Sequence, residues 1–304
     1  MDTVKAIRSF VAVADTSGFA AAARSLRMSP AAITRDVAAL EQQLGCKLLK
    51  RTTRQVALTE EGSRYLVGAR RILADVAEAE SSVMGLYGEL RGPVVVSAPS
   101  MFGQLHVGPA VIDFALRHPG VSFTTLFLDR MVDLIDEGVD VAVRIAHLQD
   151  SSATAIQVGF VRRVICAAPA YLAERGEPKT PLDLARMEGI DFTGGRLPWS
   201  FRDRDHAMLA SPSVRLSVNS VEMAIEAAAA GLGLVRLLSY QAVEAAAAGR
   251  LVLILEPFEP EPVPVHIVHL NGRTGPFRVR TFIDYLTENL RRGLGAHGAG
   301  PRPP

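Results

Sequence analysis

The sequence predicts a multidomain α+β fold, in which a winged helix-turn-helix is followed by a long helix and then by an α/β domain of two subdomains. Three observations predict this order. The N-terminal part holds a short helix, a tight turn and a helix with a Ser-Pro start. The next segment carries an apolar repeat with the 3.5-residue period of paired helices. From residue 92 onward, apolar strand segments alternate with helical ones. A chain of 304 residues is also too long for one ordinary core.

The domain boundaries follow from these patterns. We expect a winged helix-turn-helix over residues 1–59, a linker and dimerisation helix over 60–91, and an α/β domain over 92–293. Within the last domain, subdomain I takes about 92–161 and 266–293, and subdomain II takes about 162–265. Residues 294–304 are rich in Gly and Pro, which predicts a disordered tail.

Charge is distributed unevenly along the chain. Residues 1–60 hold nine Lys or Arg and five Asp or Glu, a net charge of +4, whereas the remainder carries a net charge of −3. A basic end on an otherwise acidic chain favours a polyanionic partner for that end.

The composition argues against several classes of protein. No apolar run approaches the roughly 18–20 residues that cross a bilayer, and the N-terminal residues lack the pattern of a secretory signal. The two cysteines, Cys46 and Cys166, have neither disulfide nor metal-site spacing, and we expect both to be small buried side chains. We therefore expect a cytoplasmic protein with no membrane contact, metal or resident cofactor.

Two helices are expected before residue 28. Apolar residues recur near the 3.6-residue spacing of a helix at Val4, Ile7, Phe10 and Val11, and Ser17-Gly18 interrupts this pattern. The stretch GFAAAARSL predicts a second, short helix, whose small Ala side chains let another helix pack closely.

The third helix is expected from Pro30 to about Leu44. Ser29 is a favoured N-cap, Pro30 is favoured at the first helical position, and Gly45 suits a left-handed C-terminal residue. Its inward stripe consists of Ile33, Val37, Leu40 and Leu44. Two helices joined by a tight turn form a helix-turn-helix, whose second helix enters the major groove of DNA.

A basic wing follows Gly45. Two short strands are expected at Leu48-Leu49 and Val56–Leu58, around the polar turn Arg51–Gln55. Lys50, Arg51 and Arg54 have no acidic neighbour in sequence, which suits phosphates or the minor groove. The alternative is an ordinary three-helix domain with a solvated basic loop.

The stretch FVAVADTSGFAAAARSLRMSPAAITRDVAALEQQLGCKLLKRTTRQVALTEEG resembles the signature of the LysR-type transcriptional regulator family nearly from end to end. The resemblance implies that Ser29, Pro30, Thr34 and Arg35 approach bases, and that Arg54 reaches the minor groove or the backbone. Together with the outward face of the helix and the wing, the candidate DNA-binding residues are Ser29, Pro30, Ala31, Thr34, Arg35, Lys50, Arg51, Thr52 and Arg54.

Two residues in this stretch depart from the family pattern. Arg27 stands where the family often has Gly. Asp36 stands where a neutral or basic residue is usual, and a carboxylate beside the groove either repels phosphate or accepts from a cytosine amino group. Asp36 therefore leaves the sequence preference open.

A long helix is expected after Thr59, which suits an N-cap and is followed by two acidic residues. Its apolar seam alternates steps of four and three, through Tyr65, Ala69, Ile72, Val76, Ala79, Val83, Leu86 and Leu90. This period predicts pairing with a second helix, and the resemblance likewise implies dimerisation here, through Ile72, Val76, Val83 and Leu86. The alternative is that the helix buries the stripe against its own domain.

The remaining two thirds predict a duplicated α/β unit. PVVVSAP, VSFTTLFL and DVAVRI are expected to be strands, with helices at Val107–Leu116 and at MVDLIDEG between them, which predicts a parallel sheet. Residues 155–168 form an apolar stretch long enough to cross between subdomains. A second unit follows with SVRLSV and LGLVRLL as strands, and VPVHIVHL then returns as a strand before a terminal helix over Phe277–Arg292. Two crossovers are typical of a periplasmic-binding-protein-like sensor, which the effector domain of LysR-type regulators resembles.

Ligands of open α/β sheets bind beyond the carboxyl ends of the strands. The candidate effector-binding residues at these ends are Ser100, Met101, Phe102, Arg144, Ile145, His147, Trp199, Asn219, Ser220, Val235 and Arg236. Each has a structural alternative. Ser100 and Ser220 also suit simple N-caps, Trp199 suits a cover over apolar surface, Arg144 suits a structural ion pair, and His147 suits an exposed position. Leu238 stands where the family often has Pro.

These features predict a sequence-specific transcriptional regulator that is controlled by a small-molecule effector of unknown identity. The expected partners are double-stranded DNA with an inverted repeat, a second copy of the chain in a homodimer, a homotetramer as the family implies, and RNA polymerase. The alternative is a solute-binding module without a transcriptional role. None of the usual hydrolase, nucleotide-binding or metalloprotease motifs is present, so we do not expect an enzyme.

Overall fold

The computed structural model describes residues 2–51, 56–83, 90–148, 154–193, 198–203, 206–270 and 275–296. The chain divides into two compact units. The first comprises residues 1–94, 114–124 and 274–281, and the second comprises residues 95–113, 125–273 and 282–304.

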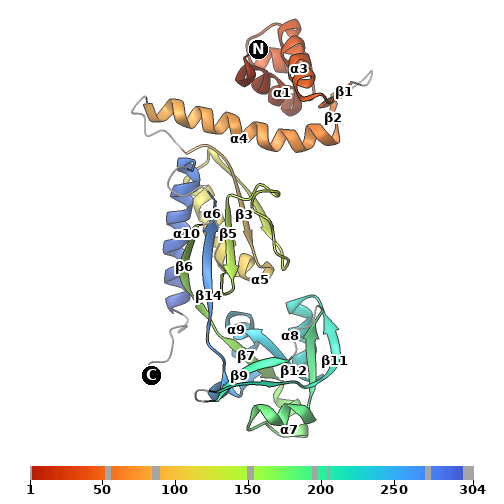
Figure 1. The fold of residues 1–304 in the computed structure, drawn as a ribbon, viewed down its shortest axis with the longest axis vertical. Coiled ribbons are helices and arrows are strands. Elements are labelled where there is room, and N and C mark those ends of the chain that lie inside the picture. The colour runs from red at the N-terminus through yellow and green to blue at the C-terminus, as the bar shows by residue number, and fades with distance from the viewer. Residues whose placement is uncertain are drawn as a thin grey trace. The chain divides into compact units, whose positions relative to one another are not determined.

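The first three helices form the helix-turn-helix that the sequence predicts (Figure 1). They are α1 (Thr3–Thr16), α2 (Phe19–Ser25) and α3 (Pro30–Leu44). The hydroxyl of Ser29 accepts from the N–H of Ala32 at 3.2 Å, and Gly45 ends α3 at φ 69°, so both predicted caps are confirmed. Fully buried side chains join the helices into one core, among them Phe10, Ile33 and Leu40.

A two-stranded wing follows α3. Strand β1 (Leu49–Arg51) pairs antiparallel with β2 (Val56–Leu58), and Leu49 lies opposite Leu58. The turn between the strands, with the candidate residues Thr52 and Arg54, lies outside the described residues, as does the side chain of Arg51. We call the N-terminal unit built from α1–α3, this wing and the start of the next helix the head.

Helix α4 (Glu60–Val83) is the long helix of the sequence prediction. The described chain resumes at Leu90, which is not helical, so the last seam position is not part of a helix. Ala69 is fully buried and Tyr65 half-buried, and both pack on the head core. The first part of the seam is therefore covered by its own domain, which was the alternative interpretation, whereas Ile72 is 43% exposed.

The first sheet of the α/β domain has the strand order β4-β3-β5-β14-β6. Its strands are β3 (Gly92–Ala98), β4 (Val121–Phe127), β5 (Val141–Ile145), β6 (Thr154–Val161) and β14 (Val263–His269). Strands β3 and β5 are parallel, but β14 runs antiparallel to both β5 and β6. Helices α6 (Gly108–Arg117) and α10 (Phe277–Ala296) accompany this sheet (Figure 1).

The second sheet has the order β11-β8-β12-β7-β13. Its strands are β7 (Arg163–Ala167), β8 (Glu188–Phe192), β11 (Ser213–Val218), β12 (Leu234–Leu238) and β13 (Val252–Ile254). The helices around it are α7 (Pro169–Arg175), α8 (Val221–Ala229) and α9 (Ser239–Ala247). Strand β12 is parallel to β8 and antiparallel to β7. Both sheets are thus mixed rather than parallel, because segments that cross between them enter in the reverse direction.

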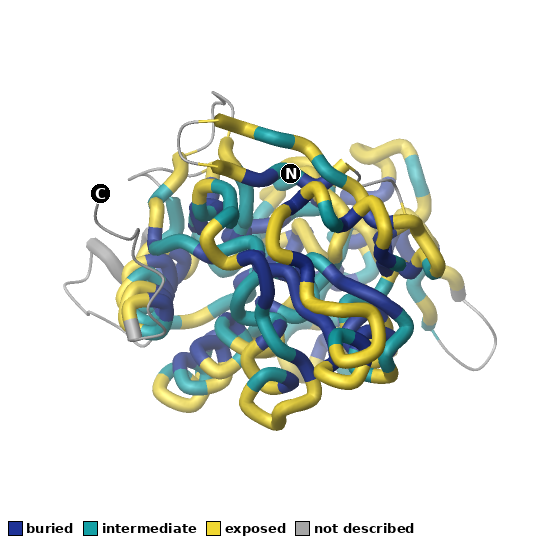
Figure 2. The backbone as a smooth tube through the Cα atoms, turned by 90° about the horizontal axis from the view of Figure 1, so that it is seen from below, coloured by how far each residue is buried: buried dark blue, intermediate teal, exposed yellow. Residues whose placement is uncertain are grey.

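Buried stretches alternate with exposed ones along the chain (Figure 2), and β5 and β7 are among the strands with the most buried residues. Cys166 is fully buried on β7, as expected, and burial, aided by the charges of Glu259 and Glu256, raises the pKa of its thiol to about 12. Cys46 is half-buried in the head.

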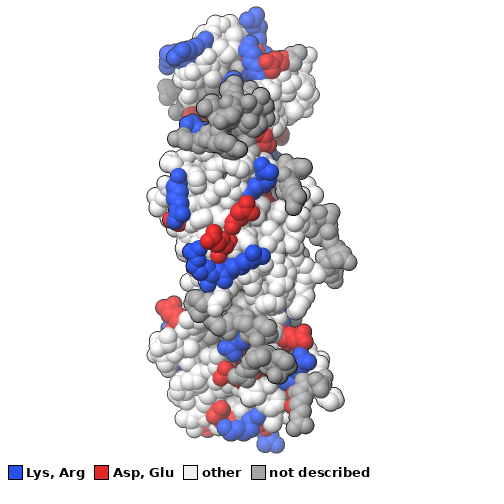
Figure 3. Space-filling model, turned by 90° about the vertical axis from the view of Figure 1, so that its left-hand side faces the viewer, with Lys and Arg blue, Asp and Glu red and all other residues white. Residues whose placement is uncertain are grey.

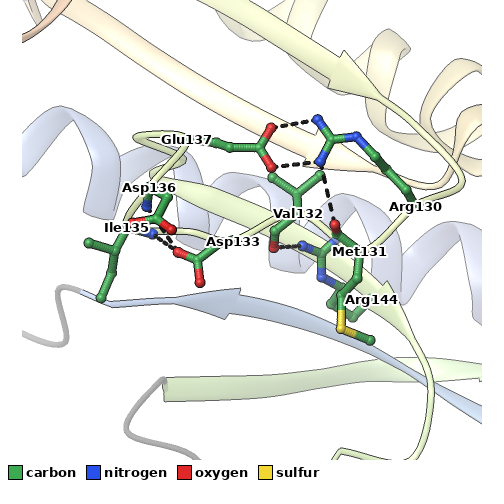
Figure 4. Close-up of polar contacts among 8 residues, drawn as sticks. All are labelled: Arg130, Met131, Val132, Asp133, Ile135, Asp136, Glu137 and Arg144. Atoms are coloured by element: carbon green, nitrogen blue, oxygen red, sulfur yellow. Dashed lines mark hydrogen bonds and ion pairs between the residues drawn. The ribbon is translucent and has the colours of Figure 1, made fainter.

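The helix expected at residues 131–138 is wrong, because this segment is a series of turns (Figure 4). The carboxylate of Asp133 accepts from the N–H groups of Ile135 and Asp136, at 2.8 and 2.9 Å. Such a local bond offers the backbone an alternative to the helix. These two bonds also lower the pKa of Asp133. Arg130 and Glu137 then close the segment with two hydrogen bonds of 2.7 Å.

Candidate DNA-binding head and effector domain

The N-terminal end of α3 is open to solvent. Ser29, Pro30, Ala31 and Arg35 are exposed, and Thr34 is half-buried. Lys50, on β1, is also exposed. The side chains that the sequence selected on α3 thus share one accessible helix end, which is the part of a recognition helix that contacts base edges.

Arg27, in the turn before α3, has a left-handed backbone with φ 53°. A side chain disfavours this conformation, and Gly adopts it without cost. Arg27 therefore adopts the same left-handed turn that glycine would adopt, but with more backbone strain.

Asp36 belongs to the packing between α1 and α3. Its carboxylate accepts from the hydroxyl of Ser9 at 3.0 Å, and Ser9 is fully buried on α1. Lys5, also on α1, lies 3.9 Å away, and the side chain of Asp36 is only 20% exposed. Asp36 therefore lies between the two helices, where it stabilises the packing of α3 against α1.

We expect Asp36→Ala to lower the free energy of unfolding of the head by about 1–3 kcal/mol, because the buried hydroxyl of Ser9 loses its acceptor. Ser9→Ala alone removes the donor and leaves a carboxylate that water still reaches, so its effect should be smaller. Urea denaturation of both single variants and the double variant gives the coupling. Additive losses would show that the two groups do not interact.

Glu41 connects the end of α3 to the wing. One carboxylate oxygen accepts from the N–H groups of Leu48 and Leu49, at 3.0 and 3.2 Å, and the other accepts from Lys47 at 2.6 Å. Glu41 is only 8% exposed. Burial raises its pKa, but the hydrogen bonds from Lys47, Leu49 and Leu48 outweigh this effect, so the pKa of Glu41 is lowered. The ionised carboxylate is thus the form that orients the first wing strand.

The start of α4 holds the same short segment from its other side. The hydroxyl of Thr59 donates to the carbonyl of Lys47 at 2.7 Å and accepts from the N–H of Gly62 at 2.8 Å. A Cβ atom on Gly62 would lie 1.9 Å from the carbonyl oxygen of Leu48. The segment Lys47–Leu49 therefore joins α3, the wing and α4. Neither Glu41 nor Gly62 was predicted as a functional residue. Their only signals in the sequence are a carboxylate on the inward face of α3 and a glycine inside a helix.

The residues after the first strand of the α/β domain diverge in environment. The N–H of Ser100 donates to Asp129 at 3.0 Å and its hydroxyl donates to the carbonyl of Phe127 at 3.3 Å. Phe102 is fully buried and therefore belongs to the core. Met101 is half-buried and lines a pocket described below.

Arg144 ends β5 and is half-buried. Its guanidinium donates to the carbonyl of Val132 at 2.8 Å and lies beside Met131 (Figure 4). Burial lowers the pKa of Arg144, and the charge of Glu137 opposes this shift. Ile145 is half-buried, and His147 is exposed. No carboxylate of the described residues forms an ion pair with Arg144, so the structural ion pair considered for it is not observed.

The N-terminus of α8 has an acidic side chain, Glu222, in its first turn. Ser220 is the N-cap, since its hydroxyl accepts from the N–H of Met223 at 3.2 Å, and it donates to the carboxylate of Glu222 at 2.7 Å. Asn219 is exposed. The favourable field at this helix end therefore acts on Glu222.

The remaining candidates separate to different sides of the second sheet. Trp199 lies on strand β9 (Trp199–Asp203), which pairs with β10 (His206–Ala210), and it is 1% exposed. Its ring packs in a core with Leu234 and lies 5.6 Å from the guanidinium carbon of Arg236. Val235 is fully buried in the other core of this sheet. Trp199 and Val235 are thus structural residues.

A pocket of about 480 Å³ lies elsewhere in the same unit. It is lined by Met101, by a π-helical turn η1 (Gly103–Val107), by Phe160–Arg162 and by α9, with Leu253 and Leu294. Met101 is the one candidate residue of the sequence analysis on its wall.

Several surface charges of the described residues are paired. Some basic side chains lie beside acidic ones on the face in Figure 3, and the ion pairs include Arg130–Glu137 and Arg250–Glu226. No helix in the described part of the chain has the length and apolar character for crossing a membrane. Its described His, Cys, Asp and Glu residues form no group that could hold a metal ion.

Comparison with known families matches both parts of the chain. Residues 4–63 match the family described as bacterial regulatory helix-turn-helix protein, lysR family, and residues 87–291 match the LysR substrate binding domain.

Similar proteins cover nearly the whole chain. The regulator PtxR of Pseudomonas aeruginosa is 34% identical over 286 residues, covering 93% of this chain and 91% of that protein. The regulator CrgA of Neisseria meningitidis serogroup B is 32% identical over 290 residues, covering 94% and 96%. The solved structure of CrgA superposes with a TM-score of 0.60 at 30% identity, covering 94% of this chain and 98% of that one. With its helix-turn-helix and its effector-binding domain, the chain belongs to the LysR family of DNA-binding transcriptional regulators.

Proposed function

We propose that this regulator recognises its operator through the N-terminal end of α3, with Ser29, Pro30, Ala31, Thr34 and Arg35 at the bases. The observation that carries the proposal is the exposed, Ser29-capped start of α3. Lys50, Arg51, Thr52 and Arg54 of the wing supply phosphate or minor-groove contacts. A guanidinium such as that of Arg35 can bind a guanine edge through two hydrogen bonds.

Arg35→Ala is expected to reduce operator affinity by about 1–3 kcal/mol and to reduce binding to random DNA much less. Arg8→Ala, which removes an exposed charge from α1, is the matched control and should leave discrimination unchanged. Fluorescence anisotropy with operator and shuffled duplexes measures both. Equal losses on the two duplexes would refute base recognition by Arg35.

The working form is proposed to be a homodimer through α4, with Ile72, Val76, Val83 and Leu86 at the interface. Ile72 supports this because it is 43% exposed although it belongs to the apolar seam. The side chains of Val83 and Leu86 lie outside the described residues. Two-fold pairing would place two heads on an inverted repeat. Assembly into a homotetramer and contact with RNA polymerase are further expectations from the family resemblance.

Ile72→Asp is expected to dissociate the dimer, because an unpaired carboxylate would be buried in the seam. Val67→Asp is the control, since Val67 is 64% exposed on the opposite face of α4. Light scattering over a range of concentrations gives the mass. A dimer that survives Ile72→Asp but is lost with Val67→Asp would move the interface to the other face.

A small-molecule effector is proposed to act through the cleft at the strand ends, with Ser100, Met101, Arg144, Ile145, His147, Asn219, Ser220 and Arg236 as the accessible candidates. The exposed or half-buried state of these residues supports the proposal, whereas Phe102, Trp199 and Val235 are buried. An effector that binds one cleft arrangement better shifts the equilibrium between arrangements. We expect no catalytic activity, and a cytoplasmic location because the DNA partner lies there.

A further inference from the structure

We propose that the pocket between η1 and α9 is a separate ligand site, which binds an uncharged, planar aromatic molecule. Its volume of about 480 Å³ lies within the roughly 300–1,000 Å³ of small-molecule sites. Apolar side chains from five separate segments line it, among them Leu105, Phe160, Val243, Leu253 and Leu294. Such a lining favours apolar surface over water.

Aromatic rings form one wall of the pocket. His106 and Tyr240 line it, with ring centroids 5.7 Å apart and planes at 76°. Phe102 supports both rings from within the core, at 4.6 Å from His106 and 5.2 Å from Tyr240. Aromatic rings prefer edge-to-face and offset contacts at these separations. A planar ring in the pocket would extend a cluster that already has this geometry.

The charges around the pocket favour a neutral ligand. Both carboxylate oxygens of Glu259 lie 3.0 Å from the guanidinium of Arg162, and Glu256 lies 3.5 Å away. The other ionised side chain on the wall is the carboxylate of Glu244. An anionic ligand would therefore meet a cation that two acids already neutralise, and its desolvation would not be compensated.

The helical turn beside the pocket has an unusual geometry. Residues Gly103–Val107 form a π-helical turn, which brings Leu105 and His106 to the pocket wall. A Cβ atom on Gly103 would lie 2.5 Å from the ring of Phe127, so the close approach of this turn to β4 requires glycine. Turns of this kind are rare and occur frequently at functional sites.

The pocket joins elements of both sheets. Met101 and η1 follow strand β3 of the first sheet, α9 follows β12 of the second, and Phe160–Arg162 lies where β6 passes into β7. The N–H of Arg162 donates to the hydroxyl of Ser239, at the start of α9, at 3.2 Å. A ligand that contacts all of these segments would favour one arrangement of the two sheets, and would give the regulator a second input.

Calorimetric titration of the full-length protein with 2-naphthamide and with 2-naphthoate tests the proposal. The two probes share size and shape and differ in charge. We expect 2-naphthamide to bind at least about tenfold more tightly than 2-naphthoate, because the carboxylate must be desolvated without a free cation. Ala246→Phe fills the pocket and should weaken 2-naphthamide at least about tenfold. Ala247→Phe, at the exposed neighbouring residue, should leave it unchanged.

A second variant that fills the pocket, Val243→Trp, tests the proposal if Ala246→Phe fails to fold. Val243 is 49% exposed, so the larger side chain should not disturb the core. Arg144→Ala, in the proposed cleft, should leave 2-naphthamide binding unchanged, and operator titrations report the DNA-binding function independently. The proposal is overturned if 2-naphthamide does not bind, if 2-naphthoate binds equally well, or if binding survives both filling variants.

Discussion

Replacing Gly62 by alanine is expected to destabilise the head by about 3 kcal/mol or more, because a misfit of this kind cannot be relieved by a side-chain rotation. The added Cβ would lie 1.9 Å from the carbonyl oxygen of Leu48 and 2.8 Å from its carbonyl carbon. Either α4 or the start of the wing must move. The hydroxyl of Thr59 hydrogen-bonds to Lys47 before the wing and to Gly62 in α4, so a shift of α4 also displaces the wing. Operator binding should therefore fall together with stability.

Gly68→Ala is the matched control in the same helix. Apart from its own helical turns, no atom of the described residues lies within 4 Å of a Cβ built at Gly68, so this substitution should stabilise the helix by roughly 0.5–1 kcal/mol. The two Gly-to-Ala changes thus have opposite expected signs. Urea denaturation measures the free energy of unfolding of both variants, and hydrogen exchange of residues 30–49 reports the local effect near Leu48. Equal behaviour of the two variants would refute the close contact at Leu48.

Glu41→Ala is the second change with a large expected effect. It leaves the N–H groups of Leu48 and Leu49 buried without their acceptor, at a cost of about 1–3 kcal/mol for each group. We expect faster hydrogen exchange at these two amides and weaker DNA binding through the displaced wing. Glu41→Gln keeps an oxygen for both amides and should cost much less at neutral pH.

The lowered pKa of Glu41 gives this contact a pH dependence. Because the carboxyl is more acidic in the folded head than in the unfolded chain, its contribution is present above the unfolded pKa and is lost as the pH falls through the lower folded pKa. Glu41→Gln should flatten this acid-induced loss. Lys47→Ala should change stability by no more than about 1 kcal/mol, since Lys47 is largely exposed. If Glu41→Gln and Glu41→Ala were equally destabilising, charge pairing rather than the two amide bonds would stabilise the wing.

The head could be predicted from the sequence because its signals are local. The cap at Ser29, the Gly45 stop and the inward stripe all lie within one helix or its ends. The structure confirms both caps and buries Ile33 and Leu40, whereas Leu44, at the end of the expected stripe, is 40% exposed. The role of Asp36 could not be predicted in the same way. Its acceptor function depends on Ser9, 27 residues earlier, and the helix crossing brings the two together.

The candidate effector residues were harder to place because strand ends do not reveal which face a side chain takes. Val235 and Arg236 are neighbours on β12, yet one is fully buried and the other lies over Trp199. A helix was expected at Asp133, but its carboxylate accepts hydrogen bonds from the N–H groups of Ile135 and Asp136 and the segment forms turns. The pocket beside α9 depends on segments up to 193 residues apart, from Met101 to Leu294, so no local pattern indicated it.

We propose that the two α3 helices of a dimer enter the major groove of duplex DNA and distinguish one base sequence from others. The most direct measurement is the affinity of the full-length protein for the promoter region of its own gene, compared with a shuffled duplex at several salt concentrations. We predict a preference of at least about a hundredfold and an affinity that falls steeply as salt rises. Equal affinity for the two duplexes, or no binding to either at low salt, would contradict the account.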